Sequence, residues 1–186
     1  MRVIAGSARG MRLQAVPGAT TRPISDRVKE ALFSILGESV VGARFLDLFA
    51  GTGSVGIEAL SRGASEAVFV DSEARALATI RTNLAHTRLE SAARLVHGDA
   101  FRYLTRRAEP FDLVYVAPPQ YRALWNRALL SLDANPAWLG PGGQVIVQLF
   151  PKEFEPTDLK HLDLSDERQY GSTLLCFFAR TPGPLE

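Results

Sequence analysis

Cysteine and histidine are scarce in this chain, which has one cysteine and three histidines among 186 residues. No disulfide can form within the chain, and Cys176, inside an apolar run, is expected to be a buried neutral thiol. Zinc sites place cysteine and histidine at characteristic spacings, and none of these spacings occurs here. We therefore predict no metal site at the histidines, which are His86, His97 and His161.

Long apolar runs and a strong excess of charge are also missing. No run approaches the ~20 apolar residues that a membrane-spanning helix needs, and the first residues lack the apolar segment of a secretory signal. We expect a cytoplasmic protein without a membrane partner. A net charge of +1 argues against a generally basic coat for nucleic acid.

What the chain does contain is enough apolar sequence for one core. With 46% hydrophobic residues, a chain of this size can bury about 70% of its unfolded surface. We expect residues 1–186 to form a single domain and the protein to be monomeric. Residues 181–186, with two prolines and a glycine, are expected to form a flexible tail.

Residues 1–40 predict a hairpin and a helix. Two short alternating runs, 2–5 and 11–16, flank a turn and are typical of a β-hairpin. Apolar residues then repeat at helical spacing over 28–36, after Ser25 as a candidate cap.

Residues 44–179 alternate between strand and helix patterns, which indicates an α/β fold with a mostly parallel, Rossmann-like sheet. The last two apolar runs, 159–164 and 172–179, have no helix between them. We therefore expect them to form an antiparallel hairpin, which gives seven strands with one antiparallel edge strand. The five earlier strands are predicted at 45–49, 67–70, 93–96, 113–116 and 144–150.

The stretch from Asp47 to Ser54 follows the first predicted strand and opens a helical pattern. Gly51 and Gly53 let the backbone turn sharply against a ligand, and the following helix directs its free N–H groups there. With Gly56 the stretch satisfies G-x-G-x-x-G, so the glycines fit a dinucleotide or S-adenosylmethionine. A carboxylate at Asp47 would repel a pyrophosphate but suits the cationic methionine moiety. An NAD-dependent oxidoreductase remains the alternative.

Two further aspartates are assigned by their place along the predicted strands. Asp71 ends the second strand, twenty residues after Gly51, where a carboxylate can accept hydrogen bonds from ribose hydroxyls. The structural alternative is that Asp71 caps the next helix. Asp112 precedes the fourth strand, at the far end from any ligand, and is assigned to structure.

The chain resembles the RsmD-type 16S rRNA (guanine-N2)-methyltransferases. The resemblance runs from Arg2 to about Phe178 and is carried by Arg22 to Glu30, by the glycine stretch with its following helix, by the double-proline stretch 117–121 and by a late Tyr170-Gly171-Ser172-Thr173. It implies the class I methyltransferase fold, S-adenosylmethionine as cofactor, and a guanine N2 amine of 16S rRNA, free or in a small-subunit particle, as substrate.

The resemblance also implies roles for individual residues. Asp99 is similar to the family's acid that accepts from the adenine amino group, although capping the next helix is an equal alternative. The N-terminal arginines would contact RNA, their alternative being a solvated surface. The expected cofactor residues are Asp47, Phe49, Gly51, Gly53, Asp71, Asp99 and Ala100. The expected RNA-contacting residues are Arg2, Arg9, Arg12, Arg22 and Arg27.

The expected catalytic residues are Ala117, Pro118, Pro119, Gln120 and Tyr121, where two prolines fix the backbone. The stretch departs from the family, because Ala117 replaces an Asp or Asn that orients the target amine and Gln120 replaces an aromatic residue. Losing a charged acceptor costs about 1.5–3 kcal/mol, or roughly ten- to hundredfold in rate. Either backbone carbonyls, Gln120 and Tyr121 compensate, or the protein is an impaired module that still binds cofactor and RNA.

Overall fold

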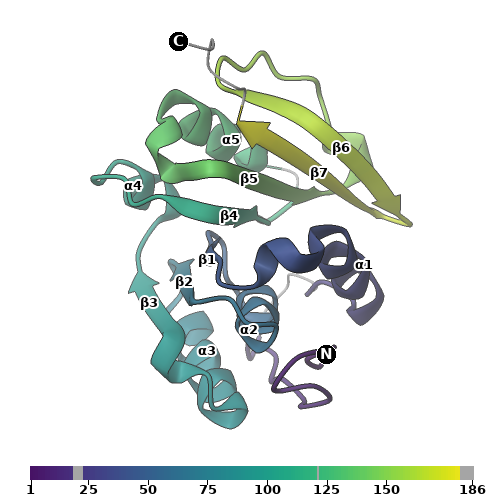
Figure 1. Ribbon diagram of the computed structural model, residues 1–186, viewed down its shortest axis with the longest axis vertical. Helices are drawn as coiled ribbons and strands as arrows, with labels where there is room; N and C mark the ends of the chain where they lie inside the picture. Colours follow the sequence, from purple (N-terminus) through teal and green to yellow (C-terminus); the bar gives the residue numbers. More distant parts are fainter. Residues whose placement is uncertain (19–22, 121, 181–186) are drawn as a thin grey trace.

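Seven strands form one sheet in the computed structural model, which describes residues 1–18, 23–120 and 122–180. Arg22, Tyr121 and the segment 181–186 lie outside the described residues. In spatial order the sheet runs β3-β2-β1-β4-β5-β7-β6, with helices on both faces (Figure 1). The strands are β1 (Arg44–Asp47), β2 (Glu66–Asp71), β3 (Ala93–His97), β4 (Phe111–Val116), β5 (Leu139–Leu149), β6 (Leu162–Tyr170) and β7 (Thr173–Arg180).

The five α-helices of the described residues cover the two faces unequally. Side chains alternate along each strand, so Phe45 and Phe69 face one core and Leu46 and Val68 the other. The first core is covered by α1 (Asp26–Leu36), α2 (Ser54–Ser61) and α3 (Ala74–Thr87). The second is covered by α4 (Ala100–Leu104) and α5 (Leu124–Ala134). Short 3₁₀ helices are η1 (Gly37–Val40), η2 (Glu90–Ala92), η3 (Pro136–Trp138) and η4 (Pro151–Glu153).

Strand directions confirm the predicted fold class. Strands β1 to β5 pair in parallel, and β7 pairs antiparallel with both β5 and β6. The reversed strand is therefore one place in from the edge, and β6 closes the sheet.

The predicted boundaries of the last hairpin were partly wrong. β6 covers Leu162–Tyr170, where the sequence predicted 159–164. Most of this edge strand is polar and exposed, and its register shifts between Leu164 and Asp166. An edge strand has one paired side and one exposed face, so its sequence lacks the apolar run on which the prediction relied.

The N-terminal hairpin is much shorter than predicted. The segment 1–18 has one antiparallel bridge, Arg2 with Arg12, supported by a hydrogen bond from the Val3 N–H to the Met11 carbonyl (2.9 Å). A longer ladder does not form because the next two N–H groups bond elsewhere. Those of Ile4 and Ala5 donate to the carboxylate of Glu58 in α2, at 2.8 and 3.0 Å.

The Glu58 carboxylate is the centre of a buried charged cluster. Glu58 and Lys29 are both 0% exposed, and their charged atoms lie 3.4 Å apart. The Arg62 guanidinium donates to the same carboxylate at 2.8 Å, and the Lys29 ammonium donates to the Arg2 carbonyl at 2.6 Å. Burial lowers the pKa of Lys29, while the charge of Glu58 opposes that shift. The cluster therefore fixes the N-terminal segment to α1 and α2.

We expect Glu58→Gln to reduce the free energy of unfolding by about 3–5 kcal/mol, because it leaves the Lys29 ammonium buried without its counter-charge. Adding Lys29→Met should restore a large part of that loss, since the second change removes the unpaired charge. Urea unfolding of both variants measures this. Equal loss in the single and double variants would contradict a charge-pairing role.

A second stability prediction concerns Gly56, the third glycine of the motif. A Cβ at this position would lie 2.4 Å from Cε1 of the Phe69 ring, so only glycine lets α2 pack this close to β2. Gly56→Ala should cost about 1–3 kcal/mol of unfolding free energy. Gly98→Ala is the matched control, because a Cβ there meets nothing within 4 Å. Equal urea midpoints for the two variants would show that the ring moves aside freely.

Candidate active site

The predicted site residues gather at the carboxyl ends of the parallel strands. Asp47 ends β1 and Asp71 ends β2, and these strands are neighbours. The stretch 117–119 follows β4, which pairs with β1 on its other side. Such strand ends form the ligand crevice of open α/β sheets. The fold therefore brings the cofactor and catalytic segments predicted from the sequence to one edge.

The loop between β1 and α2 needs glycine at two positions. Gly51 and Gly53 have φ of 54° and 75°, in the left-handed region. A Cβ on Gly53 would also lie 3.1 Å from the Ile80 side chain. At Gly51 a Cβ would meet nothing within 4 Å, which leaves the backbone open to a ligand.

Asp71 has a structural role in this site. Its two carboxylate oxygens accept hydrogen bonds from the backbone N–H groups of Gly51 and Glu73, both at 2.8 Å. The side chain thus holds the glycine loop against the start of α3. Each carboxylate oxygen has a further lone pair, so a ribose role stays compatible and remains a prediction.

Asp99 caps a helix, which was the structural alternative for this residue. Its carboxylate accepts from the Arg102 N–H at 2.9 Å as the N-cap of α4. Ala100 is buried as the first residue of that helix. A role of either residue toward adenine remains a prediction.

Phe101, which the sequence analysis missed, packs against Phe49, one of the predicted cofactor residues. Phe49, from the glycine stretch, contacts the ring of Phe101 edge to face, with centroids 6.0 Å apart. The Arg127 guanidinium lies over the Phe101 ring, 3.8 Å from its centroid. The signal available in the sequence for this contact was Phe101, the aromatic residue directly after Asp99 and Ala100.

Asp47 lies in an apolar environment. It is 2% exposed and accepts one hydrogen bond, from the Gly56 N–H at 3.2 Å. Burial raises the pKa of Asp47 to about 7, a shift that the Gly56 hydrogen bond opposes and the charge of Asp71 increases. A cation bound next to this group would favour its ionised form.

Tyr115 and Gln148 form a hydrogen-bonded polar pair next to Asp47 in the sheet, and the sequence analysis missed both. Tyr115 is the β4 partner of Asp47 in the sheet register, and its hydroxyl donates to the Gln148 side-chain oxygen. Burial, with the charge of Asp47, raises the pKa of Tyr115 well above its ordinary value. The phenol is therefore a hydrogen-bond donor that links β4 to β5 next to Asp47. A single buried tyrosine in an apolar strand gave no signal for this.

Asn83 connects the glycine loop to the N-terminal segment. Its buried side-chain nitrogen donates to the Thr52 carbonyl (3.0 Å) and to the Gln14 carbonyl (3.1 Å), and its oxygen accepts from the Gln14 N–H (2.7 Å). The Thr52 hydroxyl also donates to the Met1 sulfur at 3.4 Å. The helical spacing of apolar residues predicted α3 but not the hydrogen bonds of Asn83 to the loop and to the N-terminal segment.

The stretch predicted to be catalytic is an irregular segment after β4. Ala117 and Pro118 are half-buried, and Pro119 and Gln120 are exposed. Ala117 packs against the core that α1 and α2 cover. Tyr121 is outside the described residues, so the proposed compensation for the missing carboxylate stays a prediction.

Asp112 is structural, as expected, although it lies inside β4. Its carboxylate accepts from the Arg44 N–H at 2.7 Å, at the opposite end of the sheet from the glycine loop.

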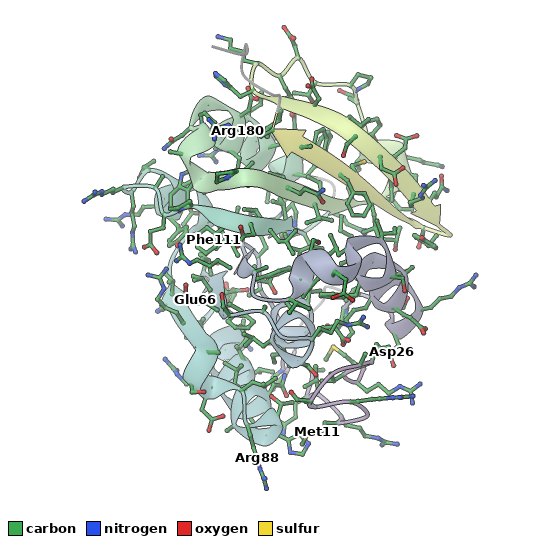
Figure 2. All side chains as sticks on the ribbon, viewed as in Figure 1. Met11, Asp26, Glu66, Arg88, Phe111 and Arg180 are labelled. Carbon is green, nitrogen blue, oxygen red and sulfur yellow. The ribbon has the colours of Figure 1, made fainter. Side chains whose placement is uncertain are left out.

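Three of the N-terminal arginines, Arg2, Arg9 and Arg27, line one cavity beside the start of α1. Figure 2 shows Met11 of the N-terminal segment near Asp26 at the start of α1. Arg2 contacts the Asp26 carboxylate at 3.4 Å and is largely exposed. Arg9, Arg12 and Arg27 are exposed. Arg22 lies outside the described residues.

No group of three or more metal-ligating side chains occurs in residues 1–18, 23–120 and 122–180. In the same part of the chain, no helix has the length and apolar character needed to cross a membrane.

A family model described as "Conserved hypothetical protein 95" matches residues 1–179. The chain belongs to this family, the RsmD family. It is 37% identical to "Putative rRNA methyltransferase YlbH" of Bacillus subtilis, over 97% of this chain and 99% of that protein. It is 32% identical to "Ribosomal RNA small subunit methyltransferase D" of Escherichia coli K12, over 97% and 90%. The solved structure titled "Putative methyltransferase yhhF from Escherichia coli" superposes with a TM-score of 0.84 at 33% identity, covering 97% of each chain.

Membership in the RsmD family confirms the predicted enzyme class, an S-adenosylmethionine-dependent methyltransferase. It gives no support to the two alternatives, the NAD-dependent oxidoreductase and the impaired binding module.

The raised pKa of Asp47 predicts an unusual pH dependence. In the unfolded chain this group titrates near 3.8 and in the folded protein at about 7, so the folded state binds the proton more tightly. Its contribution to stability is therefore present at low pH and is lost as pH rises toward 7. Asp47→Asn should stabilise the protein more at about pH 8 than at about pH 5. Thermal unfolding at both values tests this, and an equal effect at both would contradict it.

Proposed function

We propose that this RsmD-family protein transfers a methyl group from S-adenosylmethionine to a guanine N2 amine of 16S rRNA. The observation that carries the proposal is the buried carboxylate of Asp47 beside an open glycine loop, with the double-proline stretch on the adjacent strand. A relative named as a small-subunit rRNA methyltransferase supports the choice of RNA.

The cofactor fits the residues around the glycine loop. Asp47 would face its cationic methionine end, which removes the cost of ionising a buried carboxylate. The backbone at Gly51 is open, and with Gly53 in the same loop it would let the cofactor approach closely. Asp71 would accept from the ribose, Asp99 and Ala100 would face the adenine, and Phe49 would form part of the apolar wall.

When bound, S-adenosylmethionine supplies an electrophilic methyl on a sulfonium sulfur. The guanine N2 lone pair would form the new N–C bond as the methyl–sulfur bond breaks, and the electrons of the broken bond would stay on the sulfur, which becomes a neutral thioether. The amine releases its extra proton to solvent, so no general base is required. Catalysis then depends on orientation.

Residues 117–121 would orient the amine. Pro118 and Pro119 restrict the backbone so that its carbonyls keep fixed directions. The Ala117 carbonyl and the Gln120 amide oxygen are the proposed acceptors for the amine hydrogens, and Tyr121 the proposed stacking partner of the base.

The remaining assignments are part of the same proposal. RNA, as 16S rRNA or within a small-subunit particle, would contact the N-terminal arginines. We propose that the protein works in the cytoplasm as a monomer and as a single methyltransferase domain. Residues 1–40 would recognise RNA, residues 44–179 bind the cofactor, and residues 181–186 form a tail.

The test is tritium transfer from labelled cofactor to small-subunit particles from a strain that lacks this protein. The wild type should transfer the label. Ala117→Asp should change the single-turnover rate by less than about tenfold, because other acceptors already hold the amine. Calorimetry with adenosylhomocysteine is the control, since neither Ala117 form should differ in cofactor affinity.

An inactive wild type on particles shown to be substrates for another family member would contradict the proposal. Rescue of that inactivity by Ala117→Asp, by about ten- to hundredfold, would identify a protein that binds cofactor and RNA without transferring the methyl group.

Cofactor binding gives a separate prediction. Asp47→Asn should weaken adenosylhomocysteine about ten- to hundredfold, because a charge-assisted contact to its ammonium is lost. Wild-type affinity should rise with pH through about 7, where Asp47 ionises, and the variant should lose that dependence. Calorimetry across this range measures both. Affinity that is unchanged by the substitution would place the ammonium elsewhere.

A further inference from the structure

A cavity of about 410 Å³ lies between the N-terminal segment and the first turns of α1. Its charged lining side chains are Arg2, Arg9, Asp26, Arg27 and Glu30. Neither the glycine loop nor the double-proline stretch contributes to it. The cavity is therefore separate from the site proposed for methyl transfer.

The walls of the cavity are held in place by bonds already formed. The Arg2 N–H donates to the Asp26 carboxylate at 3.2 Å, and the Arg2 guanidinium lies 3.4 Å from the same group. On the other side the Lys29 ammonium donates to the Arg2 carbonyl at 2.6 Å. Because Lys29 is fully buried and bound to Glu58, the backbone at Arg2 is fixed before any ligand arrives.

Three of the charged side chains that line the cavity have no charged partner among the described residues. Within the described residues, Arg9, Arg27 and Glu30 are exposed, and none forms a side-chain hydrogen bond or ion pair. Arg2 and Asp26 largely neutralise each other. The free charges facing the cavity are therefore two guanidinium groups and one carboxylate.

This charge pattern selects a class of ligand. Guanidinium groups bind phosphate through paired N–H donors, but a carboxylate on the same cavity would repel a ligand that is only an anion. A carboxylate instead accepts hydrogen bonds from amino groups on a base, such as N4 of cytosine. A nucleotide carries both features, and unpaired bases expose these edges.

We propose that this cavity binds an unpaired nucleotide of the RNA substrate, with its phosphate on Arg9 and Arg27 and the amino edge of its base on Glu30. The proposal rests on the proposed function, because it takes RNA as the substrate. It adds a preference for amino-bearing bases over uracil.

The position of the cavity fits a nucleotide close to the one that is methylated. Arg2 lines the cavity, and the preceding residue, Met1, contacts the Thr52 hydroxyl in the glycine loop. The N-terminal segment therefore leads directly from the cavity to the loop. One strand of RNA could occupy both sites.

The test measures binding of the full chain to cytosine-only and uracil-only oligoribonucleotides of equal length by fluorescence anisotropy. The wild type should bind the cytosine oligomer about five- to hundredfold more tightly, the discrimination expected for one good base contact. Glu30→Ala should abolish this preference. Glu38→Ala, an exposed carboxylate on η1 outside the cavity, should retain it.

Salt dependence tests the phosphate contacts. Arg9→Ala and Arg27→Ala should each weaken both oligomers alike and reduce the log–log salt slope by about 0.7. Arg81→Ala, an exposed arginine on α3 outside the cavity, is the control and should leave the slope unchanged.

Two kinds of failure can be told apart. If Glu30→Ala keeps the cytosine preference, or if the cavity arginines do not change the slope, the cavity proposal is wrong, while methyl transfer by the wild type still supports the proposed function. If the wild type binds neither oligomer and transfers no label to particles, the proposed function fails as well. Adenosylhomocysteine calorimetry on each variant confirms that it is folded.

Discussion

The buried carboxylate of Glu58 is the contact on which the arrangement of this molecule depends. It joins α2, which begins at the glycine loop, to Lys29 of α1 and to the backbone of Ile4 and Ala5. A buried charge is costly unless it is paired and fully hydrogen-bonded, and here the partners come from the N-terminal segment, from α1 and, through Arg62, from α2 itself. The segment expected to meet RNA is thereby fixed to the helix that shapes the cofactor site.

A second set of bonds links the same two regions at the glycine loop itself. Asn83 binds both Gln14 and Thr52, so the N-terminal segment is attached near its start and near its end. Buried polar groups of this kind specify one arrangement because any displacement leaves them unsatisfied. RNA and cofactor would therefore meet a preformed surface.

Sequence patterns predicted most of the fold, and the predicted site residues lie at one edge of the sheet. Alternating strand and helix periods predicted β1 to β5 and their helices, although β5 begins at Leu139 and not at Gln144, and the cofactor loop at the glycines with Asp47 stays a prediction. The pattern failed at β6, where an exposed edge strand needs few apolar residues, and in the N-terminal hairpin, where Glu58 takes the N–H groups that a ladder would use. The first error arises from solvent exposure of the edge strand, and the second from a partner distant in sequence.

The sequence by itself determined the α/β class, the glycine loop and the residues that the strand ends bring together, because these follow from local periodicity and from backbone requirements at Gly51 and Gly53. Only the tertiary structure decided how the charges behave. The raised pKa of Asp47 depends on the packing of α2 over the strands. The hydrogen bond of Asp71 to the glycine loop, the capping bond of Asp99 and the free charges around the N-terminal cavity depend on which neighbours folding supplies.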